Sequence, residues 1–122
     1  MKQLLLVFLG GGFGSVLRFI ISKNLNQEGL LPIGTLSVNI LGSLLIGIVL
    51  GFGFKQQLIS EDTTLLLATG FCGGFTTFSA FTYENQVFLK SGDYLTLGLY
   101  LILSIALGIA AVFGGLYISK LF

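Results

Sequence analysis

The sequence predicts an all-α integral membrane protein with four transmembrane helices, the third of them broken at its middle. Hydrophobic residues make up 54% of the 122 residues and charged residues only 9%, whereas soluble domains carry about 25% charged residues. The apolar residues form four stretches of about 20 residues, the length that crosses a bilayer. The third stretch is interrupted by Gly, Thr and Ser, and a loosened backbone at that depth survives only inside protein or beside a wet cavity.

We expect the spans at about 4–22, 33–54, 63–89 and 94–116, within one domain that takes up residues 1–122. The first stretch resembles a signal peptide, but its apolar character continues past a glycine cluster to Ile21, so we expect a retained helix. Pro32 stands where a second helix commonly begins.

The two later spans have their own boundary signals. Ser60 followed by Glu61 and Asp62 predicts a helix N-cap with an acidic first turn. The run from Lys90 to Asp93, with Gly92 inside it, predicts a tight turn before the fourth span.

Charge and cysteine content exclude several functions. The net charge of +1 argues against nucleic-acid binding by bulk electrostatics. The chain has no His and a single cysteine, which excludes an internal disulfide and a multi-cysteine metal site. We expect Cys72 to be a small packing residue.

The basic residues give no preferred orientation. An excess of Lys and Arg normally marks the cytoplasmic side. Here three fall on one side of the expected membrane and three at or near the other: Lys2, Lys55 and Lys120 against Arg18, Lys23 and Lys90. The balance reflects either a weak bias or insertion in both orientations, which would permit an antiparallel dual-topology homodimer.

Glycines favour close helix packing. Gly10 and Gly14 are four residues apart in the first span, with Gly11 and Gly12 between them, and Gly47 and Gly51 repeat the spacing in the second. Such pairs let helix backbones approach closely. A phosphate-binding loop would need Gly-Lys-Ser/Thr after a strand, and neither is present.

Two spans carry polar stripes at four-residue spacing, so each stripe shares one helix face. Their members are Thr35, Asn39 and Ser43 in the second span, and Thr96, Tyr100, Ser104 and Gly108 in the fourth. Interhelical hydrogen bonding explains such stripes, and so does a polar permeation path. Both explanations stay open from the spacing.

The third span adds two aromatic rings and an acid. Phe78 and Phe81 share a face if helix resumes after the break; they are either packing residues or rings whose positive edges meet an anion. Glu84 lies six residues past Phe78, which is about 9 Å along a helix at 1.5 Å per residue. It is either an acid whose side chain extends to the membrane surface or a functional acid within the membrane. Arg18 either anchors the first span at the interface or caps exposed carbonyls.

Three segments resemble the CrcB/Fluc family of fluoride channels. They are Gly11-Gly12-Phe13-Gly14-Ser15-Val16-Leu17-Arg18, Gly34-Thr35-Leu36-Ser37-Val38-Asn39-Ile40-Leu41-Gly42-Ser43, and Gly70 to Phe81. The likeness extends over the whole chain in length, span number and motif order, and the third segment is the most specific. Ala80 and Ser15 depart from the family's common threonine and alanine.

The resemblance implies a channel, not an enzyme, that exports fluoride passively across the bacterial inner membrane and so limits fluoride toxicity. It implies a dual-topology homodimer with two antiparallel pores. By position, the pore residues are Asn39, Phe78, Phe81, Tyr100, Ser104 and Glu84. It also implies one structural Na⁺ at the dimer centre, held by the backbone carbonyls of Gly73 and Thr76. From spacing and position alone, we expect structural roles for Gly11, Gly12 and Gly14 in helix packing and for Arg18 as an anchor or a pairing residue.

Two other functions remain open at this stage. A proton-coupled exporter of the small multidrug-resistance type also has four spans, and Glu84 would be its membrane-embedded acid. A purely structural membrane subunit would instead tolerate apolar replacement of Asn39.

Overall fold

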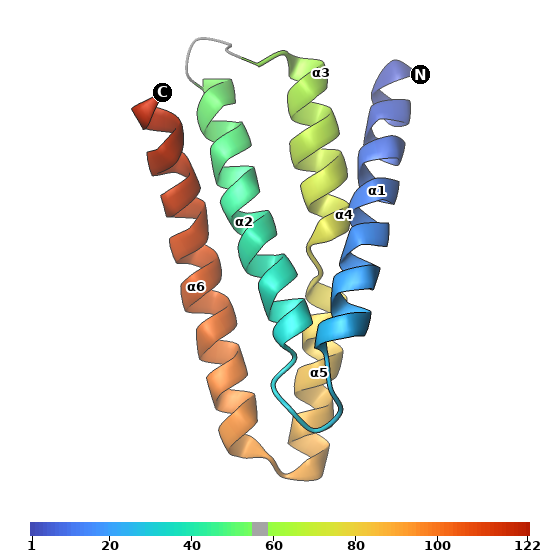
Figure 1. The fold of residues 1–122 in the computed structure, drawn as a ribbon, viewed down its shortest axis with the longest axis vertical. Helices are drawn as coiled ribbons and strands as arrows, with labels where there is room; N and C mark the ends of the chain where they lie inside the picture. Colours follow the sequence, from blue (N-terminus) through green and yellow to red (C-terminus); the bar gives the residue numbers. More distant parts are fainter. Residues whose placement is uncertain (55–58) are drawn as a thin grey trace.

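The computed structural model describes residues 1–54 and 59–122, and every regular element in these ranges is helical. Four helical segments are long and apolar enough to cross a membrane. They lie side by side as elongated rods, with both termini at the same end of the molecule (Figure 1). The predicted all-α membrane fold is confirmed at this level.

The first two spans are continuous helices. Helix α1 (Lys2–Leu25) ends where Asn26 adopts an extended conformation, with φ −79° and ψ 132°. Helix α2 (Ile33–Phe54) begins directly after Pro32, as predicted, because a proline lacks the N–H that a first turn leaves unpaired. Lys55, expected on the same side as Lys2, lies outside the described residues.

The third span is composed of four helical pieces. They are α3 (Glu61–Thr64), the π-helix η1 (Leu65–Cys72), α4 (Gly73–Phe75) and α5 (Phe78–Ser91). The predicted cap is present, since the Thr63 N–H donates to Ser60 Oγ at 3.1 Å. The break lies at Thr76 and Thr77, which are extended. The predicted break at the middle of the third span is therefore present, and Gly73 and Gly74 immediately before it are helical.

The turn into the last span follows its sequence signals. Gly92 has φ +78°, a left-handed conformation that favours glycine at the end of a helix. Asp93 then caps α6 (Tyr94–Leu121) by accepting the Thr96 N–H at 3.1 Å. Hydrogen bonds from the side chain and backbone of Thr96 lower the pKa of Asp93. Helix α6 runs five residues beyond the range expected for the span (121 against 116).

The helices pack in two pairs, α2 with α6, and α1 with η1 and α4. Beyond the break, α5 packs mainly on α6 (Figure 1). The third span thus changes its neighbour where its helix is interrupted. A buried cluster of Leu36, Phe81, Phe88 and Tyr100 fills the space between α2, α5 and α6.

Glycines allow the close crossings that the sequence predicts. A Cβ on Gly14 would collide with the Phe71 carbonyl, and one on Gly47 with the Val112 carbonyl. Gly10 and Gly74 are similarly crowded by backbone at the crossing of α1 with η1 and α4. A Cβ on Gly12, in contrast, would meet no atom of the described chain.

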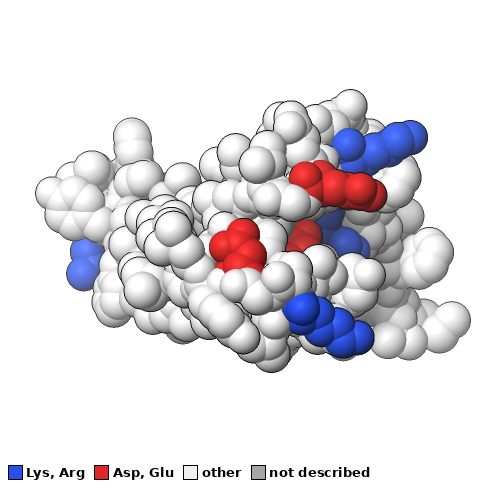
Figure 2. All heavy atoms as spheres, turned by 90° about the horizontal axis from the view of Figure 1, so that it is seen from below, with Lys and Arg blue, Asp and Glu red and all other residues white. Residues whose placement is uncertain are grey.

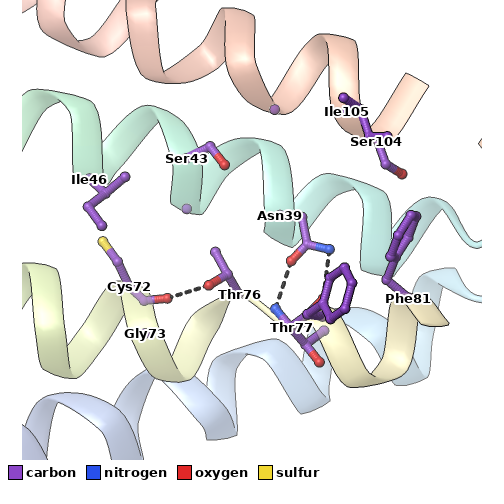
Figure 3. Close-up of a pocket in the computed structure, with 13 residues that line it drawn as sticks. Asn39, Ser43, Ile46, Cys72, Gly73, Thr76, Thr77, Phe81, Ser104 and Ile105 are labelled. Carbon is purple, nitrogen blue, oxygen red and sulfur yellow. Dashed lines mark hydrogen bonds between the residues drawn. The ribbon is translucent and has the colours of Figure 1, made fainter. Parts of the chain in front are cut away.

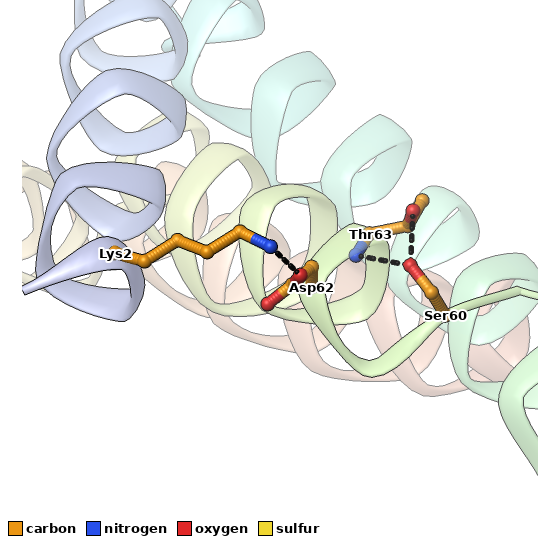
Figure 4. Close-up of polar contacts among 4 residues, drawn as sticks. All are labelled: Lys2, Ser60, Asp62 and Thr63. Carbon is orange, nitrogen blue, oxygen red and sulfur yellow. Dashed lines mark hydrogen bonds and ion pairs between the residues drawn. The ribbon is translucent and has the colours of Figure 1, made fainter.

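Charged side chains lie mainly toward the two ends. At the end with the termini, Lys2 of α1 pairs with Asp62 of α3 (Figure 4). At the opposite end, acidic and basic side chains are interspersed in a largely uncharged surface (Figure 2). The long sides of the bundle expose large apolar residues, such as Phe13 and Ile102, as expected of helices that face lipid.

Candidate functional site

A cavity of about 390 Å³ lies beside the helix break, between α2 and α6 (Figure 3). Its polar lining comes from both predicted stripes and from the break. The lining residues are Asn39, Gly42, Ser43, Ile46, Cys72, Gly73, Thr76, Thr77, Phe78, Phe81, Ser104, Ile105 and Gly108. Among these, none is charged. The structure therefore brings Asn39, Phe78, Phe81 and Ser104 to one site.

The side-chain amide of Asn39 holds the break in place. Its Oδ1 accepts the Thr77 N–H at 2.7 Å, and its Nδ2 donates to the Thr77 carbonyl at 3.0 Å (Figure 3). These are the backbone groups that the broken helix would leave unpaired. An amide nitrogen carries two hydrogens, so the second N–H of Asn39 is left for the cavity. Interhelical bonding and exposure to the cavity, which the spacing could not separate, coexist at this residue.

The two phenylalanine rings differ in their surroundings. Phe81 is 9% exposed, with its centroid 5.1 Å from the Tyr100 ring in an edge-on arrangement. Phe78 is 76% exposed in the single chain, and its centroid is 5.7 Å from that of Phe81. The Phe81 ring is fixed by packing inside the chain, while the Phe78 ring is presented at its surface.

Ser104 provides a donor with no competing protein partner. Its Oγ is buried and makes no hydrogen bond to the described residues. A buried hydroxyl without a partner costs free energy, so its position on the cavity wall points to a bound water or an anion as the missing acceptor.

Glu84 and Tyr100 lie away from this cavity, in a hydrogen-bonded cluster nearer the α1–α2 turn. The Glu84 carboxylate accepts the Thr35 and Tyr100 hydroxyls, each at 2.6 Å. It also accepts Asn26 Nδ2 at 3.3 Å. Glu84 is thus tied into the protein by three neutral donors. Tyr100 belongs to the same polar stripe as Ser104, but its ring is fully buried and its proton is directed to Glu84.

Asn26 is the member of this cluster that the sequence analysis missed. It follows α1, outside both four-residue stripes, where periodicity carries no information. The one available signal is its position, because Asn is a common capping residue near helix ends. Here its Oδ1 accepts the N–H of Thr35, in the first turn of α2, at 3.2 Å.

Arg18 contacts the break from α1. Its Nε donates to the Gly74 carbonyl at 3.0 Å, and Ser15 Oγ donates to the same oxygen at 3.3 Å. Of the two alternatives for Arg18, the structure shows the capping of an exposed carbonyl. Ser15, which departs from the family's usual alanine, adds a second donor there.

The carbonyls of Gly73 and Thr76 have lost their usual helical donors. In a continuous helix they would accept N–H groups from four residues ahead. The Thr77 N–H instead donates to Asn39, and the Ala80 N–H to Thr77 Oγ1 at 3.2 Å. Such backbone oxygens are suitable ligands for Na⁺. Within the described residues, no group of three or more His, Cys, Asp and Glu side chains forms an alternative metal site.

The expected packing residue Cys72 is buried on the cavity wall. Its carbonyl accepts both the N–H and the Oγ1–H of Thr76, each at 2.9 Å. These two hydrogen bonds stabilise the last helical turn before the break.

Four helices long enough to span a membrane, with a cavity free of charged lining residues beside the interruption of the third, define a small membrane protein of the channel or transporter class. Comparison with known proteins narrows this class. The family model described as CrcB-like protein, Camphor Resistance (CrcB) matches residues 5–116. The chain therefore belongs to the CrcB family.

Similar proteins carry the name fluoride-specific ion channel FluC. One from Gloeothece citriformis (strain PCC 7424) is 48% identical over 122 residues, covering 98% of both chains. One from Phocaeicola vulgatus is 46% identical over 122 residues, covering 98% of this chain and 100% of the relative. One from Azobacteroides pseudotrichonymphae is 41% identical over 124 residues, covering 100% and 99%.

Proposed function

We propose that the chain is a fluoride-selective channel that lets fluoride leave the cell by passive electrodiffusion and so reduces its toxicity. Its place is the bacterial inner membrane, as a multi-pass protein. One observation supports this function most directly. The Asn39 amide, the Ser104 hydroxyl without a hydrogen-bond partner and the Phe81 ring all line one cavity, and none of its lining residues is charged.

Fluoride must exchange its water shell for other donors, because a small anion is costly to desolvate. The cavity offers the second Asn39 N–H and the Ser104 O–H, and an aromatic ring presents a positive edge. Lysine and arginine are missing from the lining residues. An anion would therefore be held weakly enough to leave again, which conduction requires.

A continuous polar path would join this cavity to the end of the molecule with the α1–α2 turn. Thr35 and Tyr100 lie one turn of helix below Asn39 and Ser104, on the same two stripes. Their hydroxyls meet at Glu84. We infer that Glu84 and Tyr100 act at the mouth of the pore, and that Asn39, Phe78, Phe81 and Ser104 act deeper inside.

A homodimer would complete the site. Phe78 is 76% exposed, although it lines the cavity, so a second subunit would cover its ring. Gly73 likewise faces open space. The balance of Lys2, Lys55 and Lys120 against Arg18, Lys23 and Lys90 favours the antiparallel, dual-topology arrangement with two pores.

In that dimer we propose one structural Na⁺, bound by the Gly73 and Thr76 carbonyls of both subunits. Its chemistry would be the neutralisation of carbonyl dipoles that the break exposes. The donor set fits, because both oxygens have lost their helical N–H partners. The ion would stabilise the subunit interface and would not be transported.

The proton-coupled exporter finds no support in the family membership. Such a carrier needs an acid that substrate and protons share, whereas three hydroxyl and amide donors hold Glu84.

Replacing Phe81 tests the proposed site. In liposomes loaded with potassium fluoride, we expect Phe81→Ile to slow fluoride efflux at least about tenfold, equivalent to about 1.4 kcal/mol of barrier. Phe71→Ile is the matched control, because Phe71 packs against Phe13 and Phe75 and does not line the cavity. Equal efflux per dimer from Phe81→Ile and unmodified protein would contradict the role of the ring.

A further inference from the structure

The contacts of Asn26 connect three helices at the proposed pore mouth. Asn26 follows α1, its Oδ1 accepts the Thr35 N–H in α2, and its Nδ2 reaches Glu84 Oε1 in α5. The same Nδ2 donates to Thr35 Oγ1 at 3.0 Å. One side chain therefore fixes both the start of α2 and the carboxylate.

Both hydroxyl groups of this cluster donate their protons to the Glu84 carboxylate. A hydroxyl has a single proton to donate, and Thr35 and Tyr100 both give theirs to Glu84 at 2.6 Å. While the carboxylate stays in place, neither hydroxyl is a donor for another anion. Glu84 thus occupies the position of an anion at these two donors, and fluoride must compete with it.

A second pocket provides room for the carboxylate to move. It has a volume of about 210 Å³, and Asn26, Pro32, Glu84 and Phe88 are among its lining residues. Glu84 therefore lies between the Thr35–Tyr100 hydroxyl pair and this pocket. The Asn26 amide contacts the carboxylate and lines the pocket as well, so its hydrogen bond opposes a shift of Glu84 away from the hydroxyls.

We propose that Asn26 is a positioning residue. Its hydrogen bond holds the Glu84 carboxylate against the Thr35 and Tyr100 hydroxyls and thereby sets how readily these hydroxyls become available to fluoride. The inference rests on the proposed function. Without the Asn26–Glu84 hydrogen bond, the carboxylate would leave the two hydroxyls more easily, and fluoride would bind at a lower concentration.

The test is fluoride efflux from liposomes over a range of fluoride concentrations, for Asn26→Ala and the unmodified protein. We expect the half-saturating concentration to fall about fivefold in Asn26→Ala, the factor that corresponds to one net hydrogen bond. In the Glu84→Gln background, which removes the charged competitor, we expect the same change to have little effect. Asn24→Ala is the control, since Asn24 bonds only to Ile20 of its own helix and should leave the value unchanged.

Asn26 also caps α2, so thermal unfolding of each variant is measured in parallel. If Asn26→Ala does not fold, Asn26→Ser replaces it, because a shorter side chain loses the contact with Glu84. The proposed role of Asn26 would be contradicted if its replacement left the half-saturating fluoride concentration unchanged. It would also be contradicted if the replacement shifted this concentration equally in the unmodified protein and in the Glu84→Gln background. Absence of fluoride efflux from the unmodified protein would instead overturn the channel itself.

Discussion

At the scale of single residues, the distribution of hydrogen-bond donors separates groups that hold the protein together from groups left for an anion. Asn39 commits one N–H to Thr77 and keeps the other. Thr35 and Tyr100 commit their only protons to Glu84. Ser104 commits none to the described protein residues. Fluoride entering the cavity would therefore meet the Ser104 hydroxyl without competition from a described protein acceptor.

This difference predicts opposite effects of Ser104→Ala on transport and stability. We expect fluoride efflux to fall severalfold, because a donor is lost. The thermal midpoint should hold or rise, since removing a buried unpaired hydroxyl relieves a desolvation cost of about 1–3 kcal/mol. Liposome efflux and detergent unfolding measure the two quantities.

Ser119→Ala is the comparison for this change. Ser119 is a buried serine of the same helix, but it donates to the Leu116 carbonyl at 2.7 Å and does not line the cavity. It should leave efflux unchanged. A Ser104→Ala protein with full efflux would show that this hydroxyl does not serve fluoride.

The periodicity of the sequence identified residues that line this cavity, but it did not identify their hydrogen-bond partners. The four-residue stripes predicted that Asn39 and Ser43 share a face with each other, and that Ser104 and Gly108 do so on another helix. Both faces line the cavity. The partners of Asn39, Glu84 and Arg18 lie 38, 49 and 56 residues away in sequence at Thr77, Thr35 and Gly74, and no local pattern encodes such pairings.

At the scale of helices, the interruption at Thr76 and Thr77 lets the third span change partners. Before the break, η1 and α4 pack on α1 through glycine-lined crossings, and after it α5 packs on α6. The glycine run predicted the interruption at the middle of the span, but Gly74 serves the close crossing with α1 and remains helical, and the chain becomes extended only at Thr76 and Thr77. The π-helix was also unpredicted, since its extra residue per turn leaves no composition signal.

Gly14→Ala should disrupt the crossing of α1 with the third span. An added Cβ would collide with the Phe71 carbonyl and lie 2.9 Å from the Phe75 amide nitrogen. Overpacking against backbone costs about 1–3 kcal/mol, so the midpoint of thermal unfolding in detergent should fall clearly. Gly98→Ala on α6 is the control, because a Cβ there meets no described atom. Equal midpoints for the two variants would contradict the close crossing.

At the scale of the whole molecule, part of the candidate site lies open at the surface of the single chain. The exposed Phe78 ring and the open face at Gly73 lie next to carbonyls without helical donors. Composition and length predicted the four spans, because the membrane imposes a simple length and polarity rule. The proposed pairing of two copies would depend on surface contacts, on which the balanced charges bear only indirectly.

Sodium removal tests the proposed centre of the dimer. Because a ligand that binds only the assembled state stabilises it by mass action, replacing Na⁺ with N-methylglucamine should lower the midpoint of dimer dissociation in detergent and reduce fluoride efflux. Potassium at the same ionic strength controls for general salt effects. Unchanged dimer stability and unchanged fluoride efflux without sodium would show that no structural Na⁺ holds the dimer together.

The central claim is that this chain conducts fluoride selectively and passively. The most direct measurement compares fluoride and chloride efflux from liposomes that contain the purified protein, with valinomycin carrying potassium to clamp the voltage. For a passive fluoride channel we expect rapid, voltage-driven loss of fluoride with chloride retained. Retention of both anions by verified dimers in the presence of sodium, or equal loss of both, would contradict it.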